Sequence, residues 1–407
     1  MQQVTRSDTR STVLTVARGR EQEEATSHSQ TRQLTAVSLF TGAGGLDLGC
    51  EAAGFATRAA VECNEVARQT LLANAKRYFC GLDEGQVFSD IVTLKYEALL
   101  DAAGLEPREA DLLHGGPPCT PFSKSGYWLA YKRAGEDPKA SLLDNFVAAL
   151  VAIRPKAFLM ENVYGLAYQN HNRPVLKRFI AAVRAAGYSF DSKIILAADH
   201  AVPQVRQRLF CVGLREDLLD CPADFWRFEW PPETHGGPHE RRTEWAEGLL
   251  PHVTARKALA KLPKKQNPSE AEEVVEGTYA EALRQVPPGD NYLCLTAKRG
   301  HPSPRFVWRS RYWSFLLKLH PDRPSPTIQG QPGPWVGPFH WEDRRLRIGE
   351  VKRLMTFPDD FVLCGSRRDQ QLQLGNAVPP LLAKKVAGEI ARELQRLGVA
   401  ESVQLAA

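Results

Sequence analysis

Long hydrophobic runs are missing from this 407-residue chain. No apolar stretch approaches the roughly 18 residues that cross a bilayer, and the N-terminus has no apolar core of the kind found in signal peptides. We therefore expect a soluble, cytoplasmic protein without a membrane partner. Hydrophobic residues still make up 43% of the chain, which supports a sizeable core and excludes simple disorder and fibrous repeats. At roughly 100 to 200 residues per domain, the length suggests two domains.

Paired cysteines are also absent. The eight cysteines include no CxxC pair, which argues against a disulfide scaffold and against a paired-cysteine zinc site. Cys211, Cys221, His235 and His239 do follow one another in zinc-finger order. However, nine residues separate the two cysteines, where about two to four are usual. Cys211 also lies in the strand-like LFCVGL, so we expect no metal site.

A strong net charge is the third missing feature. The chain carries 52 Lys+Arg against 47 Asp+Glu, a formal charge of +5, which is too small for this length to identify a partner. The charge is unevenly distributed, since residues 1–200 carry 22 of each sign and residues 201–407 carry 30 basic and 25 acidic side chains. Only 7 of 28 prolines and 1 of 8 tryptophans lie in the first 200 residues. The two halves are therefore built differently.

Residues 35–215 have the pattern of one domain. Short apolar runs alternate there with helical periodicity. In chain order the runs are AVSLF, residues 58–61, a third strand candidate that ends at Asp90-Ile91, then DLLHG, AFLM, KIILA and LFCVG. Helices are predicted near 46–53, 65–77, 141–153 and 174–186. Strands that alternate with helices indicate an α/β fold with a doubly wound, mostly parallel sheet.

The other segments differ from this domain. Residues 1–34 are polar without periodicity and indicate a disordered tail, and residues 398–407 form a second tail. Residues 216–325 are rich in Pro, Trp and charge, and predict a smaller, loop-rich domain. Residues 326–397 end in a predicted helix behind Pro379-Pro380 that packs back on the first domain.

Ligands of parallel α/β sheets bind at the carboxyl ends of the strands, so the loops there are the candidate sites. The first loop runs Phe40-Thr41-Gly42-Ala43-Gly44-Gly45. Its spacing is not the GxGxxG fingerprint, and a tight turn that needs no ligand is an equal alternative. Glu62 ends the second run. Its carboxylate could accept hydrogen bonds from ribose hydroxyls, or it could be a solvated surface acid. Asp90-Ile91 ends the third, and together the loops favour an adenosine-containing cofactor.

The fourth run leads into Gly116-Pro117-Pro118-Cys119. The prolines stiffen the chain before a cysteine at a strand end, which favours a nucleophile over a structural core cysteine. Glu161 ends the neighbouring run and suits a general acid of raised pKa, or a helix cap. Gln204, Arg206 and Arg208 alternate along PQVRQRLF, so a strand would place them on one face. Such a row suits phosphate or a carbonyl, although a solvated face is the usual explanation.

A cofactor, a thiol, an acid and arginines together suggest methylation of a pyrimidine. Thiolate addition at carbon 6, aided by protonation of the ring nitrogen, makes carbon 5 nucleophilic enough to attack a sulfonium methyl. A base then removes the carbon-5 proton, and the thiol is expelled.

Eight short sequence motifs, taken in their order along the chain, resemble the bacterial type of the C5-cytosine DNA methyltransferase family. The resemblance extends from residue 36 to about 391, and the strings are SLFTGAGGLDLG, VECNE, FSDI, GGPPCTPFSKSG, MENV, the PQxRxR strand, RRLRIGEVKRLMTFPDDF and LGNAVPP. The section 216–318 corresponds to the variable target-recognition region of the family. The resemblance implies a Rossmann-like methyltransferase sheet with a second, smaller and irregular target-recognition domain.

The same resemblance implies roles for individual residues. Cys119 attacks carbon 6, Glu161 contacts and protonates the cytosine, and Arg208 assists near the base. The other catalytic residues that we carry over are Pro118, Asn162 and Arg206. S-adenosyl-L-methionine is expected to contact the cofactor-binding residues of the family, which here are Phe40, Thr41, Gly42, Gly44, Gly45, Leu46, Glu62, Cys63, Asp90, Ile91, Pro117, Leu142, Asn376, Ala377 and Val378. DNA contacts are expected from Ser123, Gln204, Arg305, Arg309, Arg311 and Thr327.

Residues 297–323 give the second half a role in this interpretation. They hold seven Lys/Arg against one acid, Asp322, interleaved with Phe306, Trp308, Tyr312, Trp313 and Phe315. Basic side chains neutralise phosphates, arginines read guanine edges and aromatic rings support an opened base stack. The plainer alternative is a small aromatic core with a charged rim, and the two are compatible.

The sequence therefore predicts a monomeric DNA cytosine-5 methyltransferase that flips its target base out of double-stranded DNA. It is either the modification enzyme of a restriction system, with a cognate endonuclease as partner, or a solitary enzyme. The alternative of a tRNA cytosine-5 methyltransferase is disfavoured by the long recognition region and by the absence of the CFT tripeptide of that branch. A nucleotide-dependent oxidoreductase and a non-catalytic DNA-binding protein are also compatible with parts of the pattern.

Overall fold

The computed structural model describes residues 33–79, 81–118, 142–168, 172–237, 248–262, 273–309 and 312–399. Three predicted site residues, Cys119, Ser123 and Arg311, lie outside these described residues, as does His239 of the zinc-finger pattern. Residues Arg32–Ala407 belong to one compact unit.

A seven-stranded sheet has the strand order β3-β2-β1-β4-β5-β8-β6. The strands are β1 (Leu34–Leu39), β2 (Phe55–Val61), β3 (Val87–Phe88), β4 (Leu112–Gly115), β5 (Ala157–Val163), β6 (Asp191–Leu196) and β8 (Gln207–Leu214). Neighbours from β3 to β5 pair in parallel, whereas β8 is antiparallel to both β5 and β6. The predicted mostly parallel α/β sheet is confirmed.

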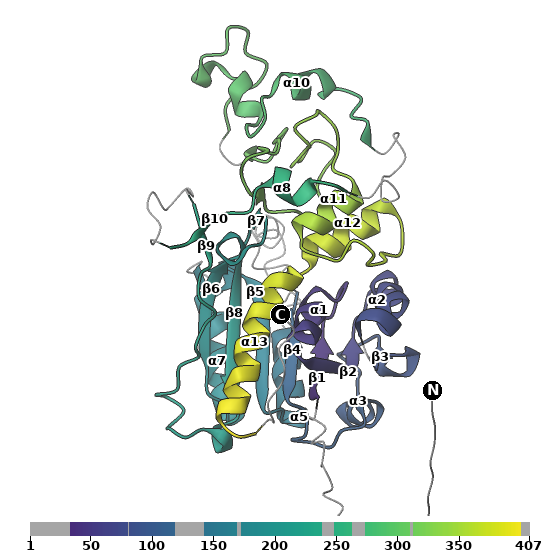
Figure 1. Ribbon diagram of the computed structural model, residues 1–407, viewed down its shortest axis with the longest axis vertical. Helices are drawn as coiled ribbons and strands as arrows, with labels where there is room; N and C mark the ends of the chain where they lie inside the picture. The colour runs from purple at the N-terminus through teal and green to yellow at the C-terminus, as the bar shows by residue number, and fades with distance from the viewer. Residues whose placement is uncertain are drawn as a thin grey trace, which may run out of the picture. The chain divides into compact units, whose positions relative to one another are not determined.

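Helices cover both faces of this sheet (Figure 1). Helices α1 (Gly45–Ala52) and α13 (Pro380–Arg396) share one core with residues of β1, β5 and β8. Helices α3 (Tyr96–Ala103), α5 (Leu142–Ile153) and α7 (Arg173–Ala185) share the core on the opposite face. Apolar residues of α13 recur at Leu382, Val386, Ile390 and Leu394 and are buried, so the predicted return of the C-terminal helix to the sheet is observed.

The order of the strands fixes where a ligand can bind. The chain proceeds from β1 outward to β2 and β3, and then returns to the other side of β1 to form β4. This reversal leaves a crevice beyond the carboxyl ends of β1 and β4, which is where α/β sheets bind ligands. The residues that follow β1, β2, β4 and β5 meet there.

Further helices of the described residues complete the fold. They are α2 (Glu65–Tyr78), α6 (Gly165–Tyr168), α8 (Ala255–Leu259), α10 (Ala280–Gln285), α11 (Ile348–Leu354) and α12 (Arg367–Asn376). Helix α2 packs with α11 and α12 residues in a third core. Short two-residue strands form two small ladders: β9 (His235–Gly236) pairs with β10 (Leu250–Pro251), and β7 (Gln204–Val205) pairs with β11 (Ser325–Pro326).

The aromatic residues of the second half form a small core of their own. Phe306 and Phe315 make edge-to-face contacts with Tyr292, with centroids 5.8 and 5.4 Å away. Tyr279 contacts Phe315 and Trp335 in the same way. The alternative of a mini-core therefore holds for these rings.

No helix within the described ranges is long and apolar enough to cross a membrane.

Candidate active site

A cleft of about 2360 Å³ lies beyond the carboxyl ends of the strands. Its first wall is the loop between β1 and α1. Phe40 has a φ of 55°, a left-handed conformation that costs about 1 kcal/mol or more and concentrates at functional sites in non-glycine residues. Gly42 has a φ of 58°, and a Cβ there would meet no atom within 4 Å. The backbone at Gly42 therefore faces open space and can be approached closely by a ligand.

Glu62 fixes this loop to the end of β2. One carboxylate oxygen accepts a hydrogen bond from the Gly42 N–H at 2.7 Å, and the other accepts one from the Asn64 N–H at 2.7 Å. Each oxygen keeps a further lone pair for a ligand. Since Glu62 is 8% exposed and lines the cleft, the alternative of a solvated surface acid does not apply.

The predicted cofactor residues meet in this cleft with one exception. Cleft-lining members are Phe40, Thr41, Gly42, Gly45, Leu46, Glu62, Cys63, Asp90, Ile91, Pro117, Leu142, Asn376, Ala377 and Val378. Gly44 is the exception, because a Cβ there would lie 2.7 Å from the Phe79 ring and 2.9 Å from Leu71. Gly44, with a φ of 76°, is thus required for packing against α2.

Asn162 connects the end of β5 to the loop that leads to Cys119. Its amide nitrogen donates to the carbonyl of Pro117 at 3.2 Å, and its oxygen accepts from the Val163 N–H at 2.9 Å. Pro117 and Pro118 line the cleft. The amide of Asn162 therefore holds the proline pair that immediately precedes Cys119 in the sequence.

Glu161 and Arg208 form an ion pair in the cleft. The antiparallel register pairs Glu161 with Phe210 and Val163 with Arg208, so the two charged side chains are diagonal neighbours on one face of the sheet. Nε of Arg208 lies 2.9 Å from a Glu161 oxygen. Burial raises the pKa of Glu161, and the charges of Arg208 and Arg206 oppose that shift. The pair can both donate a proton and stabilise the resulting carboxylate.

The predicted row of Gln204, Arg206 and Arg208 is divided in the structure. Only Arg208 lines the cleft, whereas Gln204 and Arg206 are 0% exposed. The guanidinium of Arg206 donates to the carbonyls of Ile328 (3.2 Å), Gly375 (2.8 Å) and Ala377 (2.9 Å). Gln204 donates to the Leu354 carbonyl and accepts from the Ile328 N–H. These two side chains are buried because the chain after residue 325 returns and packs over Gln204–Val205. Nothing in the local sequence indicates this return.

The segment of residues 326–397, which we call the closing segment, also brings Thr327 to the cleft. Its hydroxyl donates to the carbonyl of Val205 at 2.7 Å, next to the β7–β11 ladder. Thr327 lines the cleft, and its predicted contact with DNA remains a prediction.

The basic strip at 297–323 is less uniform than its sequence suggests. Lys318 is 2% exposed and pairs with Asp343, and Arg299 pairs with Asp290 at 2.7 Å. Arg305 and Arg309 are exposed. Two of the predicted basic residues therefore serve structural ion pairs, while these two arginines face solvent.

Three aromatic side chains of the strip remain outside the small core. Trp308, Tyr312 and Trp313 are 39%, 47% and 47% exposed, and the Lys298 ammonium lies 3.7 Å from the centroid of the Trp308 ring. Tyr312 and Trp313 line the cleft. Exposed rings beside basic side chains are suited to nucleic-acid contact.

Sequence reasoning missed two polar residues in the floor of the cleft. Asp47 and His114 both line it and are both 0% exposed. A signal was present, because each interrupts an apolar run, in GLDLG and DLLHG. A charged or titratable residue inside such a run is a buried polar group, which is the informative exception to hydrophobic cores.

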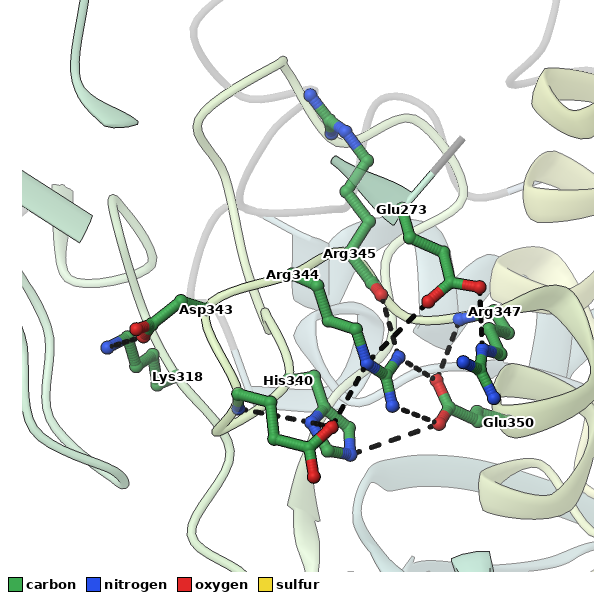
Figure 2. Close-up of polar contacts among 9 residues, drawn as sticks. Glu273, Lys318, His340, Asp343, Arg344, Arg345, Arg347 and Glu350 are labelled. Carbon is green, nitrogen blue, oxygen red and sulfur yellow. Dashed lines mark hydrogen bonds and ion pairs between the residues drawn. The ribbon is translucent and has the colours of Figure 1, made fainter. Parts of the chain in front are cut away.

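A polar cluster that includes Glu273, Arg344, Arg347 and Glu350 joins distant parts of the chain (Figure 2). Glu350 of α11 accepts hydrogen bonds from both terminal nitrogens of Arg344, at 2.9 and 2.8 Å, and from the Arg347 N–H at 2.8 Å. Arg347 in turn donates to Glu273 at 2.7 Å. The cluster therefore connects Glu273, within residues 216–325, to α11.

The charges that line the cleft are divided. From Ser38 to Val92 the described lining residues include the carboxylates Asp47, Glu62 and Asp90 but no Lys or Arg. The other part mixes Arg208, Lys318 and Arg323 with the acids Glu161, Asp322 and Asp369. The carboxylates without basic neighbours favour a cationic ligand at the β1–β2 end. Within the described ranges, no group of three or more His, Cys, Asp or Glu could hold a metal ion.

Comparison with known proteins agrees with this geometry. A family model described as C-5 cytosine-specific DNA methylase matches residues 34–392. The chain is 45% identical over 386 residues to the type II methyltransferase M.SacI of Streptomyces achromogenes, covering 89% of this chain and 94% of that protein. It is 30% identical over 346 residues to the type II methyltransferase M.NgoFVII of Neisseria gonorrhoeae, covering 84% and 83%.

Solved structures share the fold at lower identity. A DNA modification methyltransferase encoded within an Escherichia coli prophage is similar with a TM-score of 0.60 and 23% identity, covering 89% of this chain and 99% of that one. The Dnmt2 methyltransferase of Schizosaccharomyces pombe is similar with a TM-score of 0.54 and 15% identity, covering 89% and 99%. These two likenesses establish the Rossmann-like methyltransferase fold.

Proposed function

The chain belongs to the C-5 cytosine-specific DNA methylase family, and from this premise we propose that it transfers a methyl group from S-adenosyl-L-methionine to carbon 5 of a flipped-out cytosine in double-stranded DNA. The observation that carries the proposal is the Glu161–Arg208 pair, 2.9 Å apart, beside the Pro117–Pro118 loop that Asn162 holds. The next residue in the chain is Cys119.

The residues at the β1–β2 end of the cleft fit S-adenosylmethionine. The open backbone at Gly42 leaves room for close approach, and Glu62 offers a fixed carboxylate to ribose hydroxyls. Ile91 and Phe40 supply apolar surface for adenine. When bound, this cofactor supplies an electrophilic methyl group on a sulfonium. A dinucleotide would instead bring two phosphate charges toward three carboxylates, which disfavours the oxidoreductase alternative.

In the proposed reaction, the thiolate of Cys119 adds to carbon 6 of the cytosine. Glu161 donates a proton to ring nitrogen 3, for which its raised pKa is suited,. Arg208 then neutralises the Glu161 carboxylate. Carbon 5, now nucleophilic, forms a bond to the methyl group as the methyl–sulfur bond breaks, which leaves a neutral thioether. A base removes the carbon-5 proton, the electron pair of that C–H bond re-forms the C5–C6 double bond as the thiolate leaves, and ring nitrogen 3 returns its proton to Glu161.

We further propose that residues 216–325 recognise the DNA sequence and that residues 326–397 close the cofactor pocket. The similarity to type II methyltransferases supports a role in a restriction-modification system, with a cognate endonuclease as partner. A solitary enzyme is the alternative. We expect the protein to act as a monomer on DNA in the bacterial cytoplasm.

The test is covalent trapping on duplex DNA that contains 5-fluorocytosine. Fluorine at carbon 5 cannot leave as a proton does, so the Cys119–DNA adduct should persist after methyl transfer and migrate as a stable complex in denaturing gels. The Cys119→Ser variant should give no adduct, and an adduct in that variant would refute the assignment of the nucleophile. Labelled methyl transfer to duplex DNA rather than to tRNA separates the leading function from its RNA alternative.

A further inference from the structure

The floor of the cleft contains a buried carboxylate that the proposed reaction does not use. Asp47 is the third residue of α1 and is 0% exposed, yet it lines the cleft. His114, near the end of β4, is also 0% exposed and lines the same floor.

Hydrogen-bond partners are missing for both side chains. Among the described residues, neither carboxylate oxygen of Asp47 and neither ring nitrogen of His114 has one. The closest approach of the pair, His114 Nε2 to Asp47 Oδ1, is 3.9 Å, which is too long for a hydrogen bond. Ser38 interacts with the Asp47 carboxyl group and opposes the rise of its pKa, while its hydroxyl shares a 2.9 Å hydrogen bond with that of Thr41 in which either oxygen can donate. Buried polar atoms without partners are rare in native proteins and call for a cause.

The imidazole cannot neutralise this carboxylate. Burial raises the pKa of Asp47 to about 7, against the opposing effects of Ser38 and the Asp47 backbone. Burial also lowers the pKa of His114 to about 3, so the ring is neutral at physiological pH. The nearby carboxylate of Glu62 adds repulsion. A desolvated carboxylate without a counter-charge is costly, and a cationic ligand would remove that cost.

A second acid on the same helix serves as a comparison. Glu51, one turn after Asp47, is also largely buried, and burial raises its pKa to about 7. Its carboxylate accepts a hydrogen bond from the Thr57 N–H at 2.8 Å, and it is not among the cleft-lining residues. Glu51 therefore has a structural partner within the fold, whereas Asp47 does not.

We propose that Asp47 is the anionic contact for the α-ammonium group of the amino-acid part of the cofactor. This inference rests on the proposed function and extends it to a residue that the sequence did not single out. The unpaired atoms of Asp47 are acceptors, and an ammonium group has N–H donors for them, whereas a sulfonium has none. An amino-acid group also carries a carboxylate, for which the neutral His114 offers an N–H donor.

The experiment compares two adenosine ligands by calorimetric titration. S-adenosylhomocysteine has the amino-acid group, whereas 5′-deoxy-5′-methylthioadenosine lacks it. Asp47→Asn should weaken S-adenosylhomocysteine binding roughly 10- to 100-fold, the loss of a hydrogen bond to a charged group. Methylthioadenosine binding should change by less than about 3-fold, since no contact to it is lost. Glu51→Gln, the matched control, should leave both affinities within the same limit.

Thermal unfolding without ligand separates binding from folding. Asp47→Asn removes a buried charge that has no partner, so its Tm at pH 8 should equal or exceed that of the wild type. Equal losses for the two ligands, or no loss for either, would overturn the role of Asp47. If the wild type binds neither ligand, the proposed cofactor itself is wrong, which is a distinct result.

Discussion

Arg206 offers the sharpest test of how the cleft is assembled. The substitution Arg206→Met keeps the length of the side chain but removes all of its hydrogen-bond donors. Those donors reach the carbonyls of Ile328, Gly375 and Ala377 at 3.2, 2.8 and 2.9 Å in a site with 0% exposure. Gly375 and Ala377 flank Asn376, which lines the cofactor end of the cleft. The variant should therefore lose both stability and cofactor affinity.

The size of the loss follows from these contacts. Each buried carbonyl left without a donor costs about 1 to 3 kcal/mol, and partial relaxation brings the total to about 4 kcal/mol, within the range for breaking a buried charged network. With an unfolding entropy of about 2.1 cal/mol/K per residue, that loss lowers the Tm of a 407-residue chain by about 5 °C. Scanning calorimetry resolves such a shift.

Arg208→Met is the matched control, two positions along the chain. Arg208 lines the cleft and pairs with Glu161. Since Glu161 can be protonated when the cation is removed, the Tm of Arg208→Met should fall by less than about 2 °C. Methyl transfer should fall in this variant while S-adenosylhomocysteine affinity is retained. If Arg206→Met unfolded within about 1 °C of the wild type, its assignment as a positioning residue would be refuted.

Two further predictions concern Glu350 of α11 and Arg309, which lies in the region 216–325 that we propose recognises DNA. Burial opposes ionisation of Glu350, but the hydrogen bonds from Arg344 and the Arg347 N–H hold its pKa below the usual value, so its contribution is present above about pH 4.3 and is lost as the pH falls further. Glu350→Gln should therefore lower the free energy of unfolding in urea by about 3 kcal/mol at pH 7. If the difference in this free energy between variant and wild type did not shrink toward pH 3.5, the reasoning would be wrong. Arg309→Ala should weaken duplex DNA binding and lower the salt slope by about 1, with unchanged S-adenosylhomocysteine binding and with Arg284→Ala as control; equal DNA affinity at moderate salt would remove Arg309 from the interface.

The sequence predicted the sheet and most of the cleft because both depend on local signals. Apolar runs followed by Gly, Pro or acidic residues indicated β1, β2, β4 and β5 together with their loops, and the parallel fold brings those loops to one edge. Helix α12 was missed, since RRDQQLQLGN has little apolar periodicity. The only local signal was the capping box between Ser366 and Asp369,.

What the sequence could not predict depends on long-range packing. Gln204 and Arg206 alternate with Arg208 as a strand row should, but the chain from 325 to 328 pairs with β7 and buries the first two. Ion pairing in the basic strip is equally invisible, because the partners Asp290 and Asp343 lie 9 and 25 residues from Arg299 and Lys318. Local pattern therefore identified residue types, whereas contacts decided which of them face the cleft.

The closing segment explains how recognition and chemistry can be separated in one chain. Ser325 pairs with Gln204, and Thr327 donates to Val205, so residues 216–325 leave from the carboxyl end of β8 and rejoin the chain at β7, beside the amino end of β8. Arg206 then fixes the turn that carries Asn376 to the cofactor end, and α13 packs on α1. Because Ser325 and Pro326 pair with β7 where residues 216–325 end, and Arg215 and Glu216 are bound to Lys156 and Gly187 where they begin, the exposed side chains between can change without moving Glu161 or Glu62. A change at Arg309 should accordingly alter which DNA is bound, whereas a change at Arg206 should impair the enzyme on every DNA.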